Sequence, residues 1–288
     1  MKFTSYNIQY GFGADGKNDL ARIASELRGA DVIALQEVER FWERSGDVDQ
    51  AALLAELLPE YYWVYGANLD MDASHKDANG AVQNRRRQFG TMILSRHPIV
   101  SSRNFPLPKY GTMTQHSIQQ GVLEAVLDLP SAPLRVYCTH LSHLCSETRR
   151  PQVGALMDIV NRAPLEGGAW CGGHPDPRAG WTQGEMPPMP REAILMGDMN
   201  FTHASPEYAM IVGVTCEKYG RLINPQGFAD AYVLAGHEEQ SGYSVISQQY
   251  RIDHCFISSS LAPKLQKAWI DVKAQGSDHY PLHVELDV

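Results

Sequence analysis

Residues 31–37 read DVIALQE, an apolar and partly β-branched run that ends in a carboxylate. Such a run predicts a buried strand, and an unpartnered charge beside it would be costly to bury. The same combination recurs in three other segments: residues 197–200 (GDMN), 251–254 (RIDH) and 277–279 (SDH). With Asn7 and His140 they form an oxygen-rich set that includes two candidate acid–base histidines. Such a set suits a hard divalent cation and a phosphate ester.

Composition places few limits on the fold but some on the partners. In a chain of 288 residues, 43% hydrophobic and 20% charged residues are ordinary values for a globular protein with a sizeable core. The net charge of −8 argues against a surface that grips nucleic-acid backbone throughout, because such domains are usually basic. A local basic groove stays open as an alternative.

The cysteines and the N-terminal residues indicate a compartment. The chain has five cysteines, an odd number, and no Cys-x-x-Cys pair, which argues against a disulfide framework or a cysteine-rich zinc site. Residues 1–7 run directly into a strand pattern without an apolar signal-peptide core. No apolar run is long enough for a transmembrane segment. We therefore expect a cytoplasmic protein, and the sequence leaves its oligomeric state open.

Strand and helix patterns alternate loosely along the chain. Strands are predicted at residues 3–8, 31–35, 61–65, 91–94, 121–129, 134–139, 193–196, 252–257 and 282–286. Helices are predicted at residues 19–28, after an Asp49 N-cap, from a Ser146 N-cap towards Val160, and after Ser205-Pro206. Hairpin-like strand pairs occur among them. This mixture favours a layered α/β fold, and because no linker is evident we expect one domain.

Two stretches differ from the rest. Residues 68–88 are polar and end in three arginines, and residues 164–190 are rich in Gly and Pro and contain Trp170 and Trp181. Long loops are more often functional or disordered than simple connections. We therefore expect both stretches to be loops at the active site, although the tryptophans could equally anchor the second loop.

Asn7 lies at the C-terminal end of the first predicted strand, and Glu37 lies at the corresponding end of the second. Open α/β sheets commonly place ligand-binding groups at such strand ends. The two side chains could offer a carboxylate and an amide oxygen to Mg²⁺. The alternatives are a solvent-exposed glutamate and an asparagine that turns the backbone.

Asp198 and Asn200 flank Met199 just after a predicted strand. If the strand geometry continues, both side chains point to the same side. Asp198 could then orient or deprotonate a water molecule, and Asn200 could fix that carboxylate or a phosphoryl oxygen. An Asx turn after the strand is the alternative.

Asp253 interrupts an apolar strand pattern, and an inward carboxylate there would need a partner. His279 is the natural candidate, because an Asp–His hydrogen bond fixes the tautomer of the imidazole and raises its basicity. Asp278 would then be free to approach a metal ion. The alternative for residues 277–281 is a polar turn before the last strand.

His140 ends another predicted strand, and His143 follows three residues later. At a strand end this spacing is weak support for zinc. We expect His140 to donate to a phosphate oxygen and His143 to be a structural or surface group.

Arginines form two clusters, at residues 85–87 and 149–150. Such clusters are usually solvated. Because they lie beside the segments described above, Arg85, Arg86, Arg87 and Arg149 are candidates for binding an anionic substrate.

Taken in order, several motifs resemble the endonuclease/exonuclease/phosphatase superfamily, which includes DNase I. The segments that carry the resemblance are SYNI (5–8), LQEV (35–38), ILSRHPI (93–99), THL (139–141), GDMN (197–200) and SDHYP (277–281). They span essentially the whole chain. The resemblance implies a four-layer αββα sandwich with the active site at one edge of two packed sheets, and hydrolysis of a phosphoester assisted by Mg²⁺ or Mn²⁺.

The resemblance also implies a role for each candidate residue. Glu37 would be the main metal ligand, with Asn7 and Asp278 nearby. Asp198 would position or activate water with help from Asn200, and His140 would contact the phosphate. Asp253 would pair with His279. Some nucleases of the superfamily add a glutamate that orients the counterpart of His140, and this sequence does not reveal one.

These observations favour a metal-dependent phosphodiesterase or phosphatase that acts on a phosphorylated small molecule or lipid headgroup. The acidic balance makes a nuclease acting on DNA or RNA the second choice. A catalytically inactive binding protein on the same fold is the third alternative.

Overall fold

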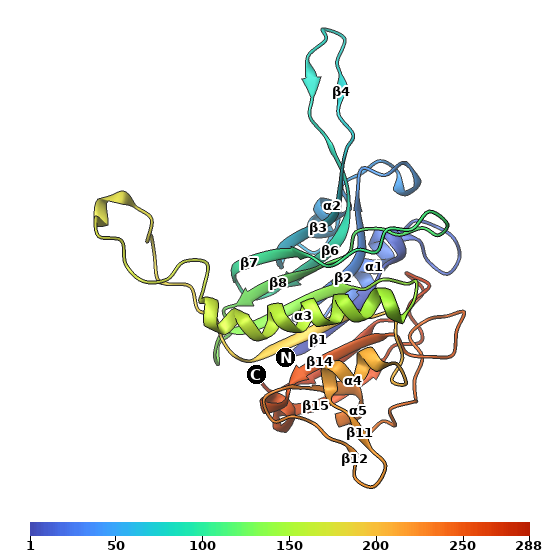
Figure 1. Cartoon of the computed structure of the whole chain (residues 1–288). Helices are drawn as coiled ribbons and strands as arrows, with labels where there is room; N and C mark the ends of the chain where they lie inside the picture. The colour runs from blue at the N-terminus through green and yellow to red at the C-terminus, as the bar shows by residue number, and fades with distance from the viewer.

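The computed structural model describes residues 1–288, and two six-stranded sheets form its centre (Figure 1). In spatial order the first sheet contains β15 (Leu265–Ile270), β16 (Leu282–Leu286), β1 (Lys2–Asn7), β2 (Val32–Arg40), β6 (Arg86–Ser95) and β3 (Tyr62–Asp72). The second sheet contains β13 (Phe228–Asp230), β14 (Asp253–Ser258), β10 (Ala193–Asp198), β9 (Leu134–His140), β8 (Gly121–Leu127) and β7 (Ile99–Pro106). Two small hairpins complete the strands: β4 (His75–Lys76) with β5 (Val82–Gln83), and β11 (Thr215–Cys216) with β12 (Gly220–Arg221).

Helices cover the outer faces of both sheets. They are α1 (Leu20–Leu27), α2 (Gln50–Leu57), α3 (Ser146–Glu166), α4 (Pro206–Val212) and the short α5 (Ala231–Leu234). Residues of α1 and α2 share a buried cluster with β2 and β6, and residues of α3 and α4 share another with β8, β9 and β10. The predicted αββα sandwich is therefore confirmed.

Strand alternation divides the apolar residues between the layers. In β2, Val32 and Ala34 enter the cluster between the two sheets, whereas Ile33 and Leu35 enter the cluster beneath α1 and α2. Because both faces of each central strand are covered, these strands are continuously apolar, as expected for buried parallel strands.

One edge of the sandwich collects the polar strand ends. β1 runs parallel to β2 in one sheet, and β9 runs parallel to β10 in the other. The hydrogen bond between Asn7 and Asp198 joins the ends of β1 and β10, so the four strands end on the same side. β14 and β16 are antiparallel to their neighbours β10 and β1, so they begin there. The topology therefore brings together residues that are far apart in the sequence.

Helix boundaries differ from the prediction mainly in α3. Asp19 caps α1 as expected, with Oδ1 accepting from the Arg22 amide at 2.9 Å. The N-cap of α3 is Cys145 rather than Ser146, and the helix continues past Val160 to Glu166. Pro151 is the sixth residue of α3 and so lies inside the helix, where it has no N–H to donate to the Glu147 carbonyl.

Residues 68–88 are not the loop that the polar composition suggested. β3 continues to Asp72 and β6 begins at Arg86, and the pair forms a long hairpin whose tip carries β4 and β5. The hairpin projects from the body of the protein (Figure 1). Register pairing from Tyr62–Ser95 to Asp72–Arg86 overrides the low strand propensity of the polar residues.

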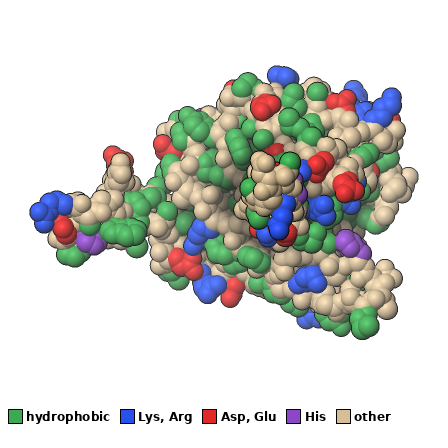
Figure 2. Space-filling view, turned by 90° about the horizontal axis from the view of Figure 1, so that it is seen from above, with side chains coloured by type: hydrophobic (Ala, Val, Ile, Leu, Met, Phe, Trp, Pro, Cys, Tyr) green, Lys and Arg blue, Asp and Glu red, His purple; other side chains and the backbone are tan.

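Residues 164–190 form a loop only after Glu166, where α3 ends. The loop stands clear of the body in two perpendicular views (Figures 1 and 2). α3 follows the strand end at His140 and spans 21 residues, roughly 30 Å. It therefore carries the chain to the opposite edge of the sandwich before the loop begins.

None of the helices is both long and apolar enough to span a bilayer. All five cysteines are free thiols.

A buried ion pair fixes the beginning of β14. Arg251 donates from Nη1 to Asp230 Oδ2 and to His254 Nδ1, both at 2.8 Å, and His254 Nε2 is 3.0 Å from the Phe201 carbonyl. All three charged or titratable side chains are nearly inaccessible. Burial opposes ionisation of Asp230, but Arg251 and His254 outweigh it and lower the pKa of the carboxyl group. The pair holds the strand that begins at Asp253.

We expect Arg251→Met to lower the free energy of unfolding by about 3–5 kcal/mol at pH 7, because Asp230 would remain buried without its counter-ion. Urea denaturation measures the change. Arg178→Met is the control, since Arg178 is 92% exposed, and such a surface change stays within about 0.5 kcal/mol. Equal losses for the two variants would contradict the assignment.

The difference in the free energy of unfolding between the wild type and Arg251→Met should also decrease below about pH 4, the usual range of an aspartate pKa. A carboxyl whose folded-state pKa is lowered adds stability above its unfolded pKa and loses it as the pH falls. The wild type therefore loses this contribution in acid, whereas the variant has none to lose. If the stability difference between the two proteins instead increased in acid, the ion pair would not be its cause.

Candidate active site

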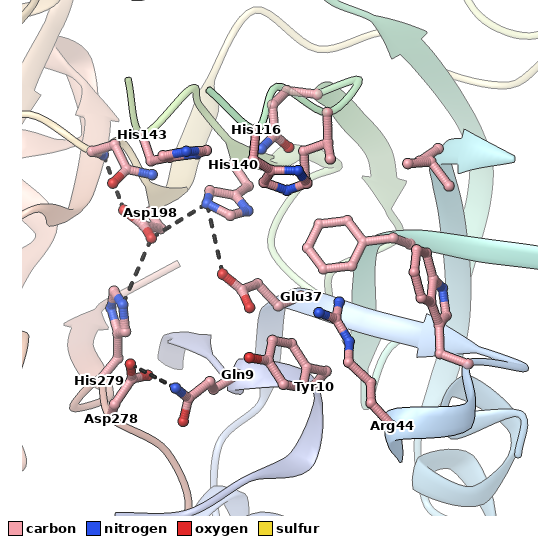
Figure 3. Close-up of a pocket in the computed structure, with 16 residues that line it drawn as sticks. Gln9, Tyr10, Glu37, Arg44, His116, His140, His143, Asp198, Asp278 and His279 are labelled. Carbon is pink, nitrogen blue, oxygen red and sulfur yellow. Dashed lines mark hydrogen bonds and ion pairs between the residues drawn. The ribbon is translucent and has the colours of Figure 1, made fainter. Parts of the chain in front are cut away.

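A cavity of about 380 Å³ opens at the edge where the polar strand ends meet (Figure 3). Its size is at the lower end of the range for small-molecule sites. Six of the residues predicted from the sequence line it: Glu37, His140, Asp198, Asn200, Asp278 and His279. Asn7 and Asp253 are buried directly behind them and touch them. The structure therefore brings the predicted metal-binding and acid–base groups together.

Glu37 reaches the cavity through a β-bulge. The register of β2 against β6 shifts between Gln36 and Val38, and Glu37 adopts a φ of 60°. Leu35 and Val38 both pack beneath the helices, so Glu37 is the extra residue that the bulge turns out of the pleat. The prediction that Glu37 ends the strand was wrong, since β2 continues to Arg40.

Asn7 connects the two sheets at this edge. Its Nδ2 donates to Glu37 Oε1 at 3.1 Å and to Asp198 Oδ2 at 3.0 Å. Its Oδ1 accepts from the Gln9 amide at 3.0 Å. The amide oxygen that was predicted to approach a metal ion therefore has a backbone partner, and Asn7 acts as a donor that holds two carboxylates.

Asp198 lies between two imidazoles. Its Oδ2 is 3.5 Å from His140 Nε2 and 3.8 Å from His279 Nε2. His279 Nδ1 is 2.8 Å from Asp253 Oδ2, so the predicted Asp–His contact is present. Burial lowers the pKa of His279, but Asp253 and Asp198 outweigh it and raise the pKa above the usual value. The arrangement favours the protonated form of the imidazole beside Asp198.

Asn200 combines the two roles that the sequence left open. It adopts a φ of 52°, and its amide donates to Asp198 Oδ1 at 3.0 Å, as in an Asx turn. Its Nδ2 donates to the Leu141 carbonyl, and the residue lines the cavity. Asn200 therefore fixes the Asp198 carboxylate through its backbone rather than its side chain.

His140 has one free nitrogen. Nε2 faces Asp198 and Glu37, at 3.5 and 3.9 Å. Nδ1 is buried and has no hydrogen-bond partner in the protein. No carboxylate orients this ring from behind, in agreement with the missing glutamate of some related nucleases.

The donors facing the cavity suit a hard divalent cation. Burial raises the pKa of Glu37, as expected for a carboxylate that lacks a full counter-charge. Asp198, Asp253 and His279 have ligand atoms within 4.8 Å of one another, but Asp253 and His279 already bind each other. Glu37 and Asp278, which accept from the Asn7 and Gln9 side-chain amides at 3.1 and 2.9 Å, are the other carboxylates that line the cavity and could hold a metal ion.

Several lining residues were not predicted from the sequence. They are Gln9, Tyr10, Trp42, Arg44, Leu69, Phe89, His116, Ile118, Gln120 and His143. His143 is exposed, as expected, but it also lines the cavity and stacks on His116 with ring centroids 5.9 Å apart. The spacing of His143 from His140 was the one available signal; His116 is in an irregular segment without a recognisable motif.

The predicted substrate-binding arginines do not line this cavity. Arg85 pairs with Asp47 and Arg86 with Asp70, while Arg87 donates to the Phe41 carbonyl at 3.3 Å. Arg149 pairs with the buried Glu207 at 3.1 Å. The first three are held by these contacts on the hairpin outside the lining, although Arg87 lies 5.8 Å from the ring centroid of the lining residue Trp42, and the α3–α4 contact occupies Arg149. No residue of 164–190 lines the cavity either, because that loop begins at the far edge.

Comparison with known proteins identifies the family. Residues 4–279 match the model of the endonuclease/exonuclease/phosphatase family. This chain belongs to that family. No match was found among curated protein sequences.

Solved structures of the family share the fold. An endonuclease/exonuclease/phosphatase protein from Beutenbergia cavernae has a TM-score of 0.67 and 21% identity, with 99% of this chain and 70% of that chain covered. A mannosyl-6-phosphatase from Bacteroides thetaiotaomicron has a TM-score of 0.64 and 17% identity over the full length of both chains. D. rerio TDP2 complexed with a single-strand DNA product has a TM-score of 0.61 and 18% identity, with 100% of this chain and 99% of that chain covered.

We expect Asn7→Asp to destabilise the protein at neutral pH in the absence of divalent cations. A third carboxylate would replace the amide that donates to Glu37 and Asp198, and charge-assisted hydrogen bonds are worth about 1.5–3 kcal/mol each. Urea denaturation with EDTA measures the loss, and Asn161→Asp on the exposed face of α3 is the control. A variant as stable as the wild type would mean that Asn7 does not hold the two carboxylates apart.

Proposed function

We propose that this chain is a Mg²⁺- or Mn²⁺-dependent phosphoester hydrolase acting on a phosphorylated small molecule or a lipid headgroup. The observation that carries the proposal is the position of Asp198 between His140 and His279, with the metal-compatible Glu37 and Asp278 on the same cavity. Family membership supports phosphoester hydrolysis as the reaction.

In the proposed reaction Asp198 accepts a proton from a water molecule that attacks phosphorus. The bond from phosphorus to the leaving oxygen breaks, and the leaving oxygen keeps the electron pair and takes a proton from solvent to depart as an alcohol. Asn7 and the Asn200 amide hold that carboxylate in place. His140 and the cationic His279 stabilise the charge that develops on the phosphoryl oxygens. Asp253 keeps His279 oriented and charged. A divalent cation held by Glu37 and Asp278 would neutralise further phosphoryl charge.

Three features favour a small substrate over a nucleic-acid strand. The cavity measures about 380 Å³. The net charge is −8, and basic and acidic side chains are interspersed on the face seen in Figure 2. Three of the arginines that could have bound a nucleic-acid strand, Arg85, Arg86 and Arg149, are paired with acidic residues. One solved protein of similar fold is a mannosyl-6-phosphatase.

The first test is hydrolysis of a chromogenic phosphomonoester, a phosphodiester and plasmid DNA with Mg²⁺, Mn²⁺ or EDTA. We expect metal-dependent hydrolysis of a small ester, reduced by about 10²–10⁴-fold in Asp198→Ala, as for loss of a general base. Asp158→Ala on α3 is the matched control. Cleavage of DNA alone would favour a nuclease, and full activity of Asp198→Ala would refute the proposed mechanism.

The roles of Glu37 and His279 separate in a second test. We expect Glu37→Gln to weaken Mg²⁺ or Mn²⁺ binding at least about tenfold, because a charged oxygen ligand is lost. His279→Ala should retain metal affinity and lower kcat by about 10²-fold or more. Calorimetric titration and steady-state kinetics distinguish the two, with Glu56→Gln on α2 as the control. Equal metal affinity of Glu37→Gln and the wild type would contradict the division.

A further inference from the structure

Arg44 is the one cationic Lys or Arg side chain among the sixteen residues that line the cavity. It follows β2 and lies across the cavity from the acid–base histidines. In Figure 3, Glu37 is between Arg44 and the group formed by His140, Asp198 and His279. The guanidinium points into the cavity but lies on the opposite side of Glu37 from Asp198, the group proposed to accept a proton from water.

The guanidinium is held in one orientation. Its Nε donates to Glu39 Oε1 at 3.0 Å, and its Nη2 binds the same oxygen. The Glu39 side chain is fully buried, whereas 46% of the Arg44 side chain is exposed. Arg44 Nη1 has no hydrogen-bond partner in the protein. The Nε and Nη2 side of the guanidinium is therefore anchored, and Nη1 is available to a ligand.

Two aromatic rings fix the guanidinium further. Its central carbon lies 4.0 Å from the Tyr10 ring centroid and 4.9 Å from the Trp42 ring centroid. These are cation–π distances. The Trp42 indole is itself fixed, because Nε1 donates to the Gln88 carbonyl at 2.8 Å.

The backbone beneath Arg44 is strained and firmly held. Tyr10 adopts a φ of 43°, which is unusual for an aromatic residue. Its carbonyl accepts from Asn18 Nδ2 at 3.0 Å and from Gln50 Nε2 at 2.7 Å. Such conformations persist where surrounding contacts impose them and are concentrated at ligand sites. A pre-organised guanidinium loses little freedom when it binds an anion.

We propose that Arg44 forms an anion subsite for the leaving group, so that the substrate carries a second phosphoryl or carboxylate group besides the scissile phosphate. This inference rests on the proposed function. Trp42, Leu69 and Phe89 line the same cavity and provide an apolar surface for the carbon body between the two anionic groups. The alternative is that Arg44 only neutralises the buried Glu39.

Matched substrate pairs test the inference: phenyl phosphate against 3- and 4-carboxyphenyl phosphate, and fructose 6-phosphate against fructose 1,6-bisphosphate. We expect the wild type to prefer the member with the second anion by about 10–100-fold in kcat/KM in at least one pair, the range of a charged hydrogen bond. Arg44→Gln should abolish this preference. Because the variant also leaves the buried Glu39 without its counter-ion, the readout is the ratio of kcat/KM values within each pair, which a loss of folded protein does not change. Arg44→Lys keeps a charge beside Glu39 but loses the fork, and should retain part of the preference.

Arg96→Gln is the matched control, because Arg96 also combines an acidic partner, Glu60, with an aromatic ring, Tyr61, but lies outside the cavity. It should retain the full preference. An equal loss on both members in Arg44→Gln, or no preference in the wild type, would overturn the subsite while leaving the hydrolase intact. Hydrolysis of no phosphoester with Mg²⁺ or Mn²⁺ would overturn the proposed function and the subsite with it.

Discussion

The contact on which the site depends is the pair of hydrogen bonds from Asn7 to Glu37 and Asp198. Glu37 belongs to the first sheet and Asp198 to the second, and like charges brought together in a partly buried space repel each other. A neutral amide that donates to both relieves this repulsion and links the sheets at their open edge. Asn7 thus fixes the separation of Glu37 and Asp198, and the other lining residues are arranged around these two carboxylates.

The layered fold was predictable because most central strands carry their own apolar signal. The family resemblance of the ordered motifs predicted the two-sheet arrangement, and the polar residues at the strand ends predicted which residues line the cavity. The hairpin β3–β6 was missed for the opposite reason: its outer half is polar, and its strand geometry comes from cross-strand pairing rather than from local propensity. The end of α3 was predicted too early, because the stretch rich in Gly and Pro begins at residue 164, before the helix ends at Glu166.

The finer features of the site depend on contacts that no local pattern encodes. Glu37 was predicted to face the cavity, but the bulge that turns it there is visible only in the register with β6. Arg44 resembles any exposed arginine in the sequence, since Tyr10 and Glu39 become its neighbours only on folding. Conversely, three adjacent arginines at residues 85–87 are conspicuous in the sequence, yet the hairpin places them elsewhere.

The length of α3 has a consequence for how this scaffold can change. Because the helix carries the chain across the whole sandwich, the loop at residues 167–192 shares no wall with the cavity and stands free of the body. Exposed loops of this kind tolerate insertions well. The edge that carries the candidate active site and the edge that carries the exposed loop are thus physically separate, so insertions in the loop need not alter the cavity.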